Sequence, residues 1–148
     1  MSEYRPKLVC FSCKFSWGYL TDEDTLAGGT DNWVPVICTG KIDTTHMLDA
    51  FRSGADGVLI LGCPGGDCHY QDGNYEARKR VHLVRKVLEP LGIEKERVRI
   101  ELSIDPEGRR IPELAEEMRN ELAKMGPPRG LLAIEATAQE TARARGGK

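Results

Sequence analysis

The sequence predicts a single α/β domain, with helices packed on both sides of a mainly parallel central sheet of about four strands. Short apolar segments alternate along the chain with longer segments in which apolar residues recur every three or four positions. The short segments are typical of strands and the long ones of amphipathic helices. Because strands that alternate with helices usually join in a parallel sheet, a three-layer fold follows.

Four segments fit the strands of this sheet: residues 7–11, 34–38, 58–62 and 98–102. The third is continuously apolar, as in strands that are buried on both faces. The fourth alternates between apolar and charged residues, which indicates the margin of the sheet. Pro35 is expected near the start of its strand, where a missing N–H group does least harm.

Three helices are expected between and after these strands. Asp43 can cap the first helix, which ends at Gly54. Asp72 or Asn74 can cap the second, and Pro112 fits the favoured first position of the third. Their apolar stripes, which should face the sheet, are Met47, Leu48 and Phe51; Val81, Val84, Val87, Leu88 and Leu91; and Leu114, Met118, Leu122 and Met125.

Composition narrows the possible classes of protein. The chain has 148 residues, of which 40% are hydrophobic and 30% charged, and its net charge is -2. No apolar run approaches the roughly 18 residues that cross a bilayer, so direct membrane insertion is not expected. The balanced charge argues against a nucleic-acid partner. The N-terminus lacks the apolar core of a secretory signal, which predicts a cytoplasmic protein.

The most informative feature is the position of the cysteines. Cys13, Cys38 and Cys63 lie at or close to the carboxyl ends of three different predicted strands, at equal spacings of 25 residues, and Cys68 follows on a glycine-rich loop. Ligands of parallel sheets bind at this edge, so a flavodoxin-like or related fold would gather these thiols on one rim. The fifth cysteine, Cys10, lies inside the first strand.

Three interpretations of the thiols are open from the residues alone. An iron-sulfur cluster needs four ligands, usually thiolates, and tolerates dispersed spacing. A structural zinc site usually has two short Cys-x-x-Cys pairs, and only Cys10 and Cys13 form one. These two residues could instead act as a thiol-disulfide oxidoreductase, which would leave the other three thiols unexplained. Thiols stay reduced in the cytosol, so an odd count of five favours metal or redox chemistry.

Three motifs resemble the methyl-viologen-reducing hydrogenase delta subunit family, over roughly residues 5–125. They are Cys38-Thr39-Gly40-Lys41-Ile42-Asp43, the segment from Gly54-Ala55-Asp56-Gly57-Val58 to Gly62-Cys63-Pro64-Gly65-Gly66-Asp67-Cys68-His69-Tyr70, and Gly73-Asn74-Tyr75. The resemblance implies an electron-transfer subunit with one 2Fe-2S cluster. Because the sequence contains no nucleotide-binding fingerprint and no acid-base constellation, we expect no substrate pocket of its own. Its implied partners are a heterodisulfide-reductase-like flavoprotein and a hydrogenase, formate dehydrogenase or similar redox subunit.

The first strand departs from the family pattern, which looks like Phe-x-Cys-x-x-Cys. Aligning Phe11 and Cys13 with that pattern places Ser16 where the second cysteine should be. Two ligand sets follow from the resemblance. Cys13, Cys38, Cys63 and Cys68 hold the cluster and Cys10 is spare, or Cys10 is recruited for the lost thiol. We favour the first set, because a thiol inside a strand behaves as a small hydrophobic group.

Residues close to the thiols have expected supporting roles. Gly62, Gly65 and Gly66 would let backbone N–H groups approach the cluster sulfurs, and His69 is a candidate ligand or neighbour of the cluster.

The chain divides at Gly126-Pro127-Pro128, which should break the third helix. Residues 1–128 are then the iron-sulfur domain. Residues 129–148 form a tail that is expected to bind a partner subunit through Leu131, Leu132 and Ile134.

Overall fold

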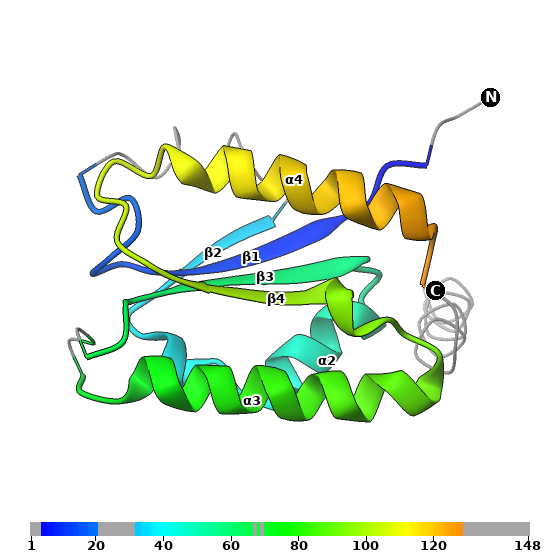
Figure 1. Ribbon diagram of the computed structural model, residues 1–148, viewed down its shortest axis with the longest axis horizontal. Helices are drawn as coiled ribbons and strands as arrows, with labels where there is room; N and C mark the ends of the chain where they lie inside the picture. The colour runs from blue at the N-terminus through cyan, green and yellow to red at the C-terminus, as the bar shows by residue number, and fades with distance from the viewer. Residues whose placement is uncertain (1–3, 21–31, 67, 69, 129–148) are drawn as a thin grey trace, which may run out of the picture.

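The protein is a three-layer α/β fold with a four-stranded parallel sheet (Figure 1). The computed structural model describes residues 4–20, 32–66, 68 and 70–128. The strands are β1 (Leu8–Cys13), β2 (Asn32–Val36), β3 (Gly57–Gly62) and β4 (Val98–Leu102). The helices are α2 (Thr44–Arg52), α3 (Gly73–Leu88) and α4 (Arg110–Met125), with short 3₁₀ turns at η1 (Thr39–Lys41), η2 (Glu89–Leu91) and η3 (Lys95–Arg97). The predicted fold class is confirmed.

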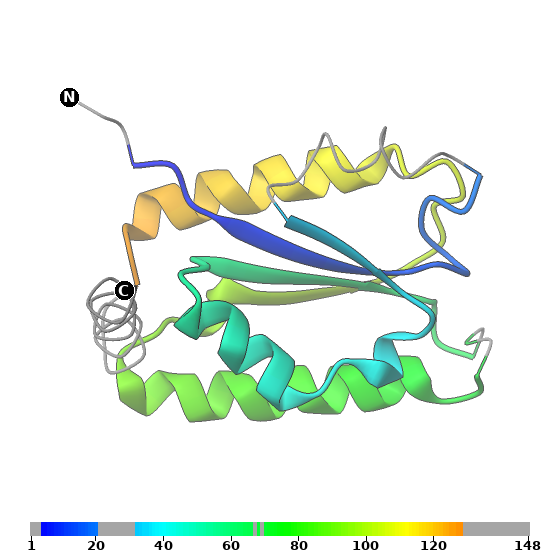
Figure 2. The ribbon, with the colours of Figure 1, turned by 180° about the vertical axis from the view of Figure 1, so that it is seen from behind.

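The strand order is β2-β1-β3-β4, so the order reverses at β1. In doubly wound sheets the crevice at such a reversal, outside the carboxyl ends of the strands, is where ligands bind. The loops that follow β1 and β3 meet at this end of the molecule, on the left in Figure 1 and on the right in Figure 2. The topology therefore brings together the ends of the strands that carry Cys13 and Cys63.

Each face of the sheet has its own hydrophobic core. Helix α4 covers one face, where its apolar stripe packs on Leu8, Cys10, Leu59 and Leu61. Helices α2 and α3 cover the other face, where they pack on alternate residues of the same strands. Because neighbouring residues of a strand point to opposite faces, Cys10 and Cys13 lie on opposite sides of β1.

The observed strands shift the predicted boundaries by up to two residues. Strand β1 extends through Cys13 because it pairs with β2 on one side and β3 on the other. Strand β2 begins at Asn32, and Pro35 lies within it rather than near its start. The sheet tolerates this proline because β2 is an edge strand. Cys38 consequently lies two residues beyond β2 instead of ending it.

The helices also differ from the prediction in detail. Asp43 caps α2 as expected, in a capping box with His46. Asp72 occupies the N-cap position of α3, but its side chain makes no capping hydrogen bond. Pro112 is the third residue of α4 rather than the first. The prediction that Val87 lies in the core is wrong, because this residue faces solvent on α3.

Candidate metal centre

Four of the five thiols lie at the carboxyl rim of the sheet. Cys13 ends β1, Cys63 directly follows β3, Cys38 precedes η1, and Cys68 lies on the loop before α3. They form two close pairs. The Sγ atoms of Cys13 and Cys63, the inner pair, are 3.6 Å apart. Those of Cys38 and Cys68, the outer pair, are 3.8 Å apart.

These distances fit two ligands on one tetrahedral metal. All five cysteines are free thiols, so neither pair is a disulfide. A thiolate ligand lies about 2.3 Å from a metal such as zinc, and two corners of that tetrahedron are about 3.8 Å apart. Within the described residues, no three His, Cys, Asp or Glu side chains converge on a single ion position. The two printed separations therefore group the thiols as two pairs.

The inner pair is almost completely shielded from water. Cys13 and Cys63 expose only 2% and 3% of their surface. Burial raises the pKa of Cys13 to about 11, and the Phe15 backbone N–H and the Ser16 hydroxyl act in the opposite direction. The Cys13 thiol also lies 3.7 Å from the Ile37 carbonyl oxygen.

The outer pair lies among backbone N–H groups at the starts of two helical segments. The Gly40 N–H donates to Cys38 Sγ at 3.4 Å, at the N-terminus of η1. Burial would raise the pKa of Cys68, but backbone N–H groups of Asn74, Tyr70 and Gly73 around the start of α3 lower it below its ordinary value. Such donors favour the thiolate, which is the form that binds metals.

Burial raises the pKa of Cys38 in spite of the Gly40 N–H, and the charges of Cys68 and Cys63 raise it further. The charge on Cys63 reaches Cys38 although the two residues belong to different pairs. The two pairs are close neighbours, because Gly73, which approaches the outer pair, and Asn74, which holds the Cys63 loop, are consecutive residues of α3.

Glycine is required where α3 approaches the outer pair. A methyl group at Gly73 would overlap Cys38 Sγ and would also reach Cys68 Sγ at 3.4 Å. The three glycines singled out from the sequence are placed differently. Gly62 is buried against Leu102 and Thr39, whereas Gly65 and Gly66 form an exposed turn. Their role at the cluster stays a prediction.

Two side chains hold the loop that carries Cys63. The Asn74 amide donates to the carbonyl oxygens of Cys63 and Pro64 at 3.1 and 2.8 Å. The Trp17 indole N–H donates to the Gly62 carbonyl oxygen at 2.9 Å. Both side chains are buried. The Cys63 loop is therefore fixed from the α3 side by Asn74 and from the β1 loop by Trp17.

The other predicted site residues lie apart from these pairs or outside the described residues. Cys10 is fully buried against α4, on the opposite face of β1 from Cys13. Burial raises the pKa of the Cys10 thiol to about 12. His69 is not among the described residues, and neither is the tail at 129–148.

Sequence reasoning did not assign Gly40, Gly73 or Asn74 to the site. A signal was present, because all three lie in the motifs that resemble the family. Their contacts with sulfur or with the Cys63 loop depend on how α3 docks, and no local pattern contains that information.

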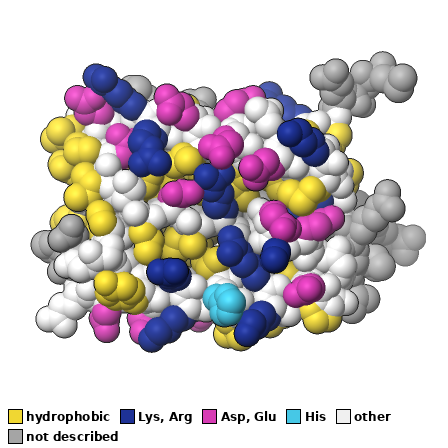
Figure 3. All heavy atoms as spheres, viewed as in Figure 1, with side chains coloured by type: hydrophobic (Ala, Val, Ile, Leu, Met, Phe, Trp, Pro, Cys, Tyr) yellow, Lys and Arg dark blue, Asp and Glu magenta, His cyan; other side chains and the backbone are white. Residues whose placement is uncertain are grey.

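The rim around the thiols is rich in exposed hydrophobic side chains (Figure 3). Among the described residues, seven of the ten exposed large hydrophobic side chains belong to the loops and helix start at this end: Phe15, Tyr19, Leu20, Ile37, Tyr70, Tyr75 and Ile104. An open pocket of roughly 510 Å³ has Cys38, Ile37 and Tyr70 in its lining. The outer pair therefore adjoins an accessible, largely apolar surface.

Comparison with known proteins places these features in a family. Residues 30–126 match the model of the family described as methyl-viologen-reducing hydrogenase, delta subunit. The chain is 38% identical over 132 residues to the iron-sulfur subunit of the F420-non-reducing hydrogenase of Archaeoglobus profundus, covering 84% of this chain and 94% of that protein. It is 38% identical over 130 residues to the iron-sulfur subunit of the vhc F420-non-reducing hydrogenase of Methanococcus voltae, covering 84% and 89%.

A second kind of relative is much longer. The chain is 30% identical over 120 residues to one subunit of the ferredoxin/F(420)H(2)-dependent CoB-CoM heterodisulfide reductase of Methanosarcina acetivorans. That match covers 80% of this chain but only 15% of the relative.

No helix among the described residues has the length and apolar character needed to cross a membrane. On the extent of the family match and the similarity to the hydrogenase iron-sulfur subunits, the chain belongs to the methyl-viologen-reducing hydrogenase delta subunit family.

Proposed function

We propose that this protein relays single electrons through one 2Fe-2S cluster held by Cys13, Cys38, Cys63 and Cys68. The observation that carries the proposal is the arrangement of these thiols in two pairs, with Sγ separations of 3.6 and 3.8 Å. A two-iron cluster needs four protein ligands, two for each iron. When bound, such a cluster accepts and releases one electron at a time.

The protein's own residues would support this cluster in two ways. The buried inner pair excludes water from one side of the site. The N–H groups at the starts of η1 and α3 stabilise negative charge on the outer pair. Hydrogen bonds to cluster sulfurs raise the reduction potential, and burial also influences it. The proposed role is relay rather than catalysis at a separate site.

The proposed partner is a heterodisulfide-reductase-like flavoprotein, with a hydrogenase, formate dehydrogenase or similar redox subunit as the second partner. Two relatives that are named as CoB-CoM heterodisulfide reductase subunits contain a segment similar to most of this chain within a much longer protein. When a relative carries a similar segment and a further region in one chain, the corresponding separate proteins are expected to bind each other. The apolar rim beside the outer pair is the proposed docking surface. The tail at 129–148 is proposed as a second contact.

The alternative functions fit the geometry less well. Cys10 and Cys13 are three residues apart in an extended strand, so their Cα atoms are about 10 Å apart. A disulfide requires less than about 7 Å. A zinc-stabilised adaptor would need three or four ligands around one ion, whereas the rim presents two pairs.

The test is the metal content of the protein after anaerobic purification. We expect two irons and two acid-labile sulfides per chain and little zinc. Cys38→Ala should lose most of the iron, because one iron would keep a single thiolate. Cys10→Ala is the matched control, since it also removes a buried thiol, and it should keep the cluster.

Other outcomes of these metal analyses would contradict the proposed cluster or its ligand set. Stoichiometric zinc without iron would overturn the proposal in favour of the adaptor. Full iron in Cys38→Ala, or iron loss in Cys10→Ala, would overturn the ligand set.

A further inference from the structure

Ser16 presents a buried hydroxyl group beside the inner pair. The residue is only 1% exposed. Its Oγ atom makes no hydrogen bond within the described residues. A buried polar group left without a partner lowers the stability of the fold. A hydroxyl in this position therefore points to a partner that binds at the rim.

The backbone holds Ser16 in place. Its N–H and that of Trp17 donate to the Cys13 carbonyl oxygen at 3.3 and 3.0 Å, which forms a tight turn at the end of β1. The Ser16 carbonyl oxygen accepts the Asp105 N–H at 2.7 Å. Asp105 is itself tied to the start of α4 through the Arg110 N–H at 2.8 Å. The hydroxyl is thus held against the rim from two sides and not carried on a free loop.

The turn that Ser16 closes begins at Cys13, a proposed cluster ligand, because the Ser16 N–H donates to the Cys13 carbonyl oxygen. Thiolates and cluster sulfides only accept hydrogen bonds, whereas a hydroxyl can donate one. An inner-pair sulfur in a bound cluster would therefore satisfy the hydroxyl that the protein alone leaves unpaired.

We propose that Ser16 donates its O–H to a sulfur at the inner pair of the bound cluster and thereby raises the reduction potential. This inference rests on the proposed function. Reduction adds one electron to the cluster and makes its sulfurs more negative. A hydrogen-bond donor stabilises this reduced form more than the oxidised form. Ser16 is a positioning and tuning residue, because four thiolates already supply the ligands.

The test is a redox titration of the full chain with its cluster, using dithionite as the one-electron reductant under anaerobic conditions. Ser16→Ala should keep two irons per chain, and its potential should become more negative. We expect a three- to tenfold change in the reduction equilibrium, where tenfold corresponds to about 59 mV for a one-electron couple. Ser16→Ala should also lose an exchangeable deuteron coupling that the reduced parent protein shows by pulsed electron paramagnetic resonance in D₂O.

Ser12→Ala is the matched control. Ser12 is also 1% exposed, but it lies on the opposite face of β1 from Cys13, and its Oγ accepts the Trp33 indole N–H at 2.7 Å. Its loss should leave the potential unchanged.

An unchanged potential in Ser16→Ala would overturn the inference, as would an equal shift in Ser12→Ala. Loss of iron from Ser16→Ala would also overturn it, by indicating that Ser16 is a ligand. A parent protein without iron would overturn the proposed function itself.

Discussion

At the residue scale, Gly73 controls how closely α3 can approach the outer pair. Its Cα atom faces Cys38 Sγ, where a side chain would overlap the sulfur. The N–H groups at the start of α3 act on Cys68 only because the helix comes this close. The absence of a side chain at one position therefore brings a helix N-terminus to a pair of thiols.

Gly73→Ala should accordingly lose at least half of the bound iron, because the new methyl group displaces Cys38 Sγ. The fold should persist, because the change lies at the start of α3 and not in the hydrophobic core. Iron per chain and far-ultraviolet circular dichroism measure the two effects. Thr44→Ala is the control, because it places the same alanine at the first residue of another helix, α2. Full iron occupancy in Gly73→Ala would contradict this account.

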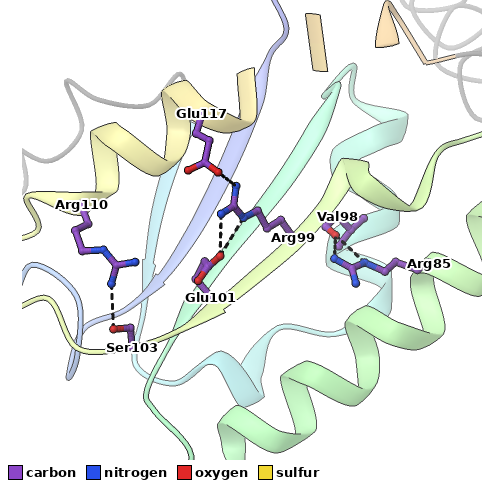
Figure 4. A network of polar contacts seen from close by, with 7 residues as sticks. All are labelled: Arg85, Val98, Arg99, Glu101, Ser103, Arg110 and Glu117. Atoms are coloured by element: carbon purple, nitrogen blue, oxygen red, sulfur yellow. Dashed lines mark hydrogen bonds and ion pairs between the residues drawn. The ribbon is translucent and has the colours of Figure 1, made fainter. Parts of the chain in front are cut away.

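At the element scale, β4 is an edge strand whose polar groups are protected by neighbouring helices (Figure 4). Arg85 reaches from α3 and donates to the Val98 carbonyl oxygen through Nε at 2.8 Å and a terminal nitrogen at 2.6 Å. Arg99 on β4 forms ion pairs with Glu101 at 2.9 Å and with Glu117 of α4 at 3.3 Å. Charged side chains on an edge oppose pairing with another chain.

Arg85→Ala should lower the free energy of unfolding by about 1–3 kcal/mol, since it removes a charged donor from the edge of the sheet. Lys86→Ala provides the comparison, because it makes the same change on an exposed neighbouring position of α3 and should stay within about 0.5 kcal/mol. Urea unfolding of the cluster-containing proteins would measure both. Equal destabilisation by the two variants would show that the loss comes from the helix and not from the edge contact.

At the scale of the whole molecule, the apolar surface is concentrated at the end that carries the thiols. Clusters of exposed hydrophobic side chains commonly mark the sites at which proteins bind a partner. The proposed electron relay requires a partner to approach the proposed cluster, and the outer pair adjoins this surface. The arrangement supports docking of the proposed flavoprotein partner at the carboxyl rim.

Ile37→Ser should weaken binding of the heterodisulfide-reductase-like partner by about fivefold or more, as expected for an apolar residue central to an interface. Leu83→Ser is closely matched, because Ile37 is 53% exposed and Leu83, on α3, is 54% exposed. Its effect should be negligible. Binding of each variant, with its cluster intact, can be measured by calorimetry against the purified partner. Equal affinity of the two variants would argue that docking occurs elsewhere.

The sequence alone determined the fold class, the strands and helices, and the rim at which the thiols gather. These properties follow from apolar periodicity and from the rule that parallel strands end at one edge. Continuous burial of residues 58–62 and the capping of α2 by Asp43 are local patterns, and both are confirmed. The motifs that resemble the family can also be recognised in the sequence without knowledge of any tertiary contact.

Only the tertiary structure decided which thiols pair and what surrounds them. Sequence could not place Cys10 and Cys13 on opposite faces, because its apolar pattern predicts a strand that ends at residue 11. The extension of this strand through Cys13 comes from pairing with β2 and β3. The closeness of Gly73 to Cys38, and the unpaired Ser16 hydroxyl, depend on how distant segments dock. Such contacts arise from packing between elements, which no periodicity within one element encodes.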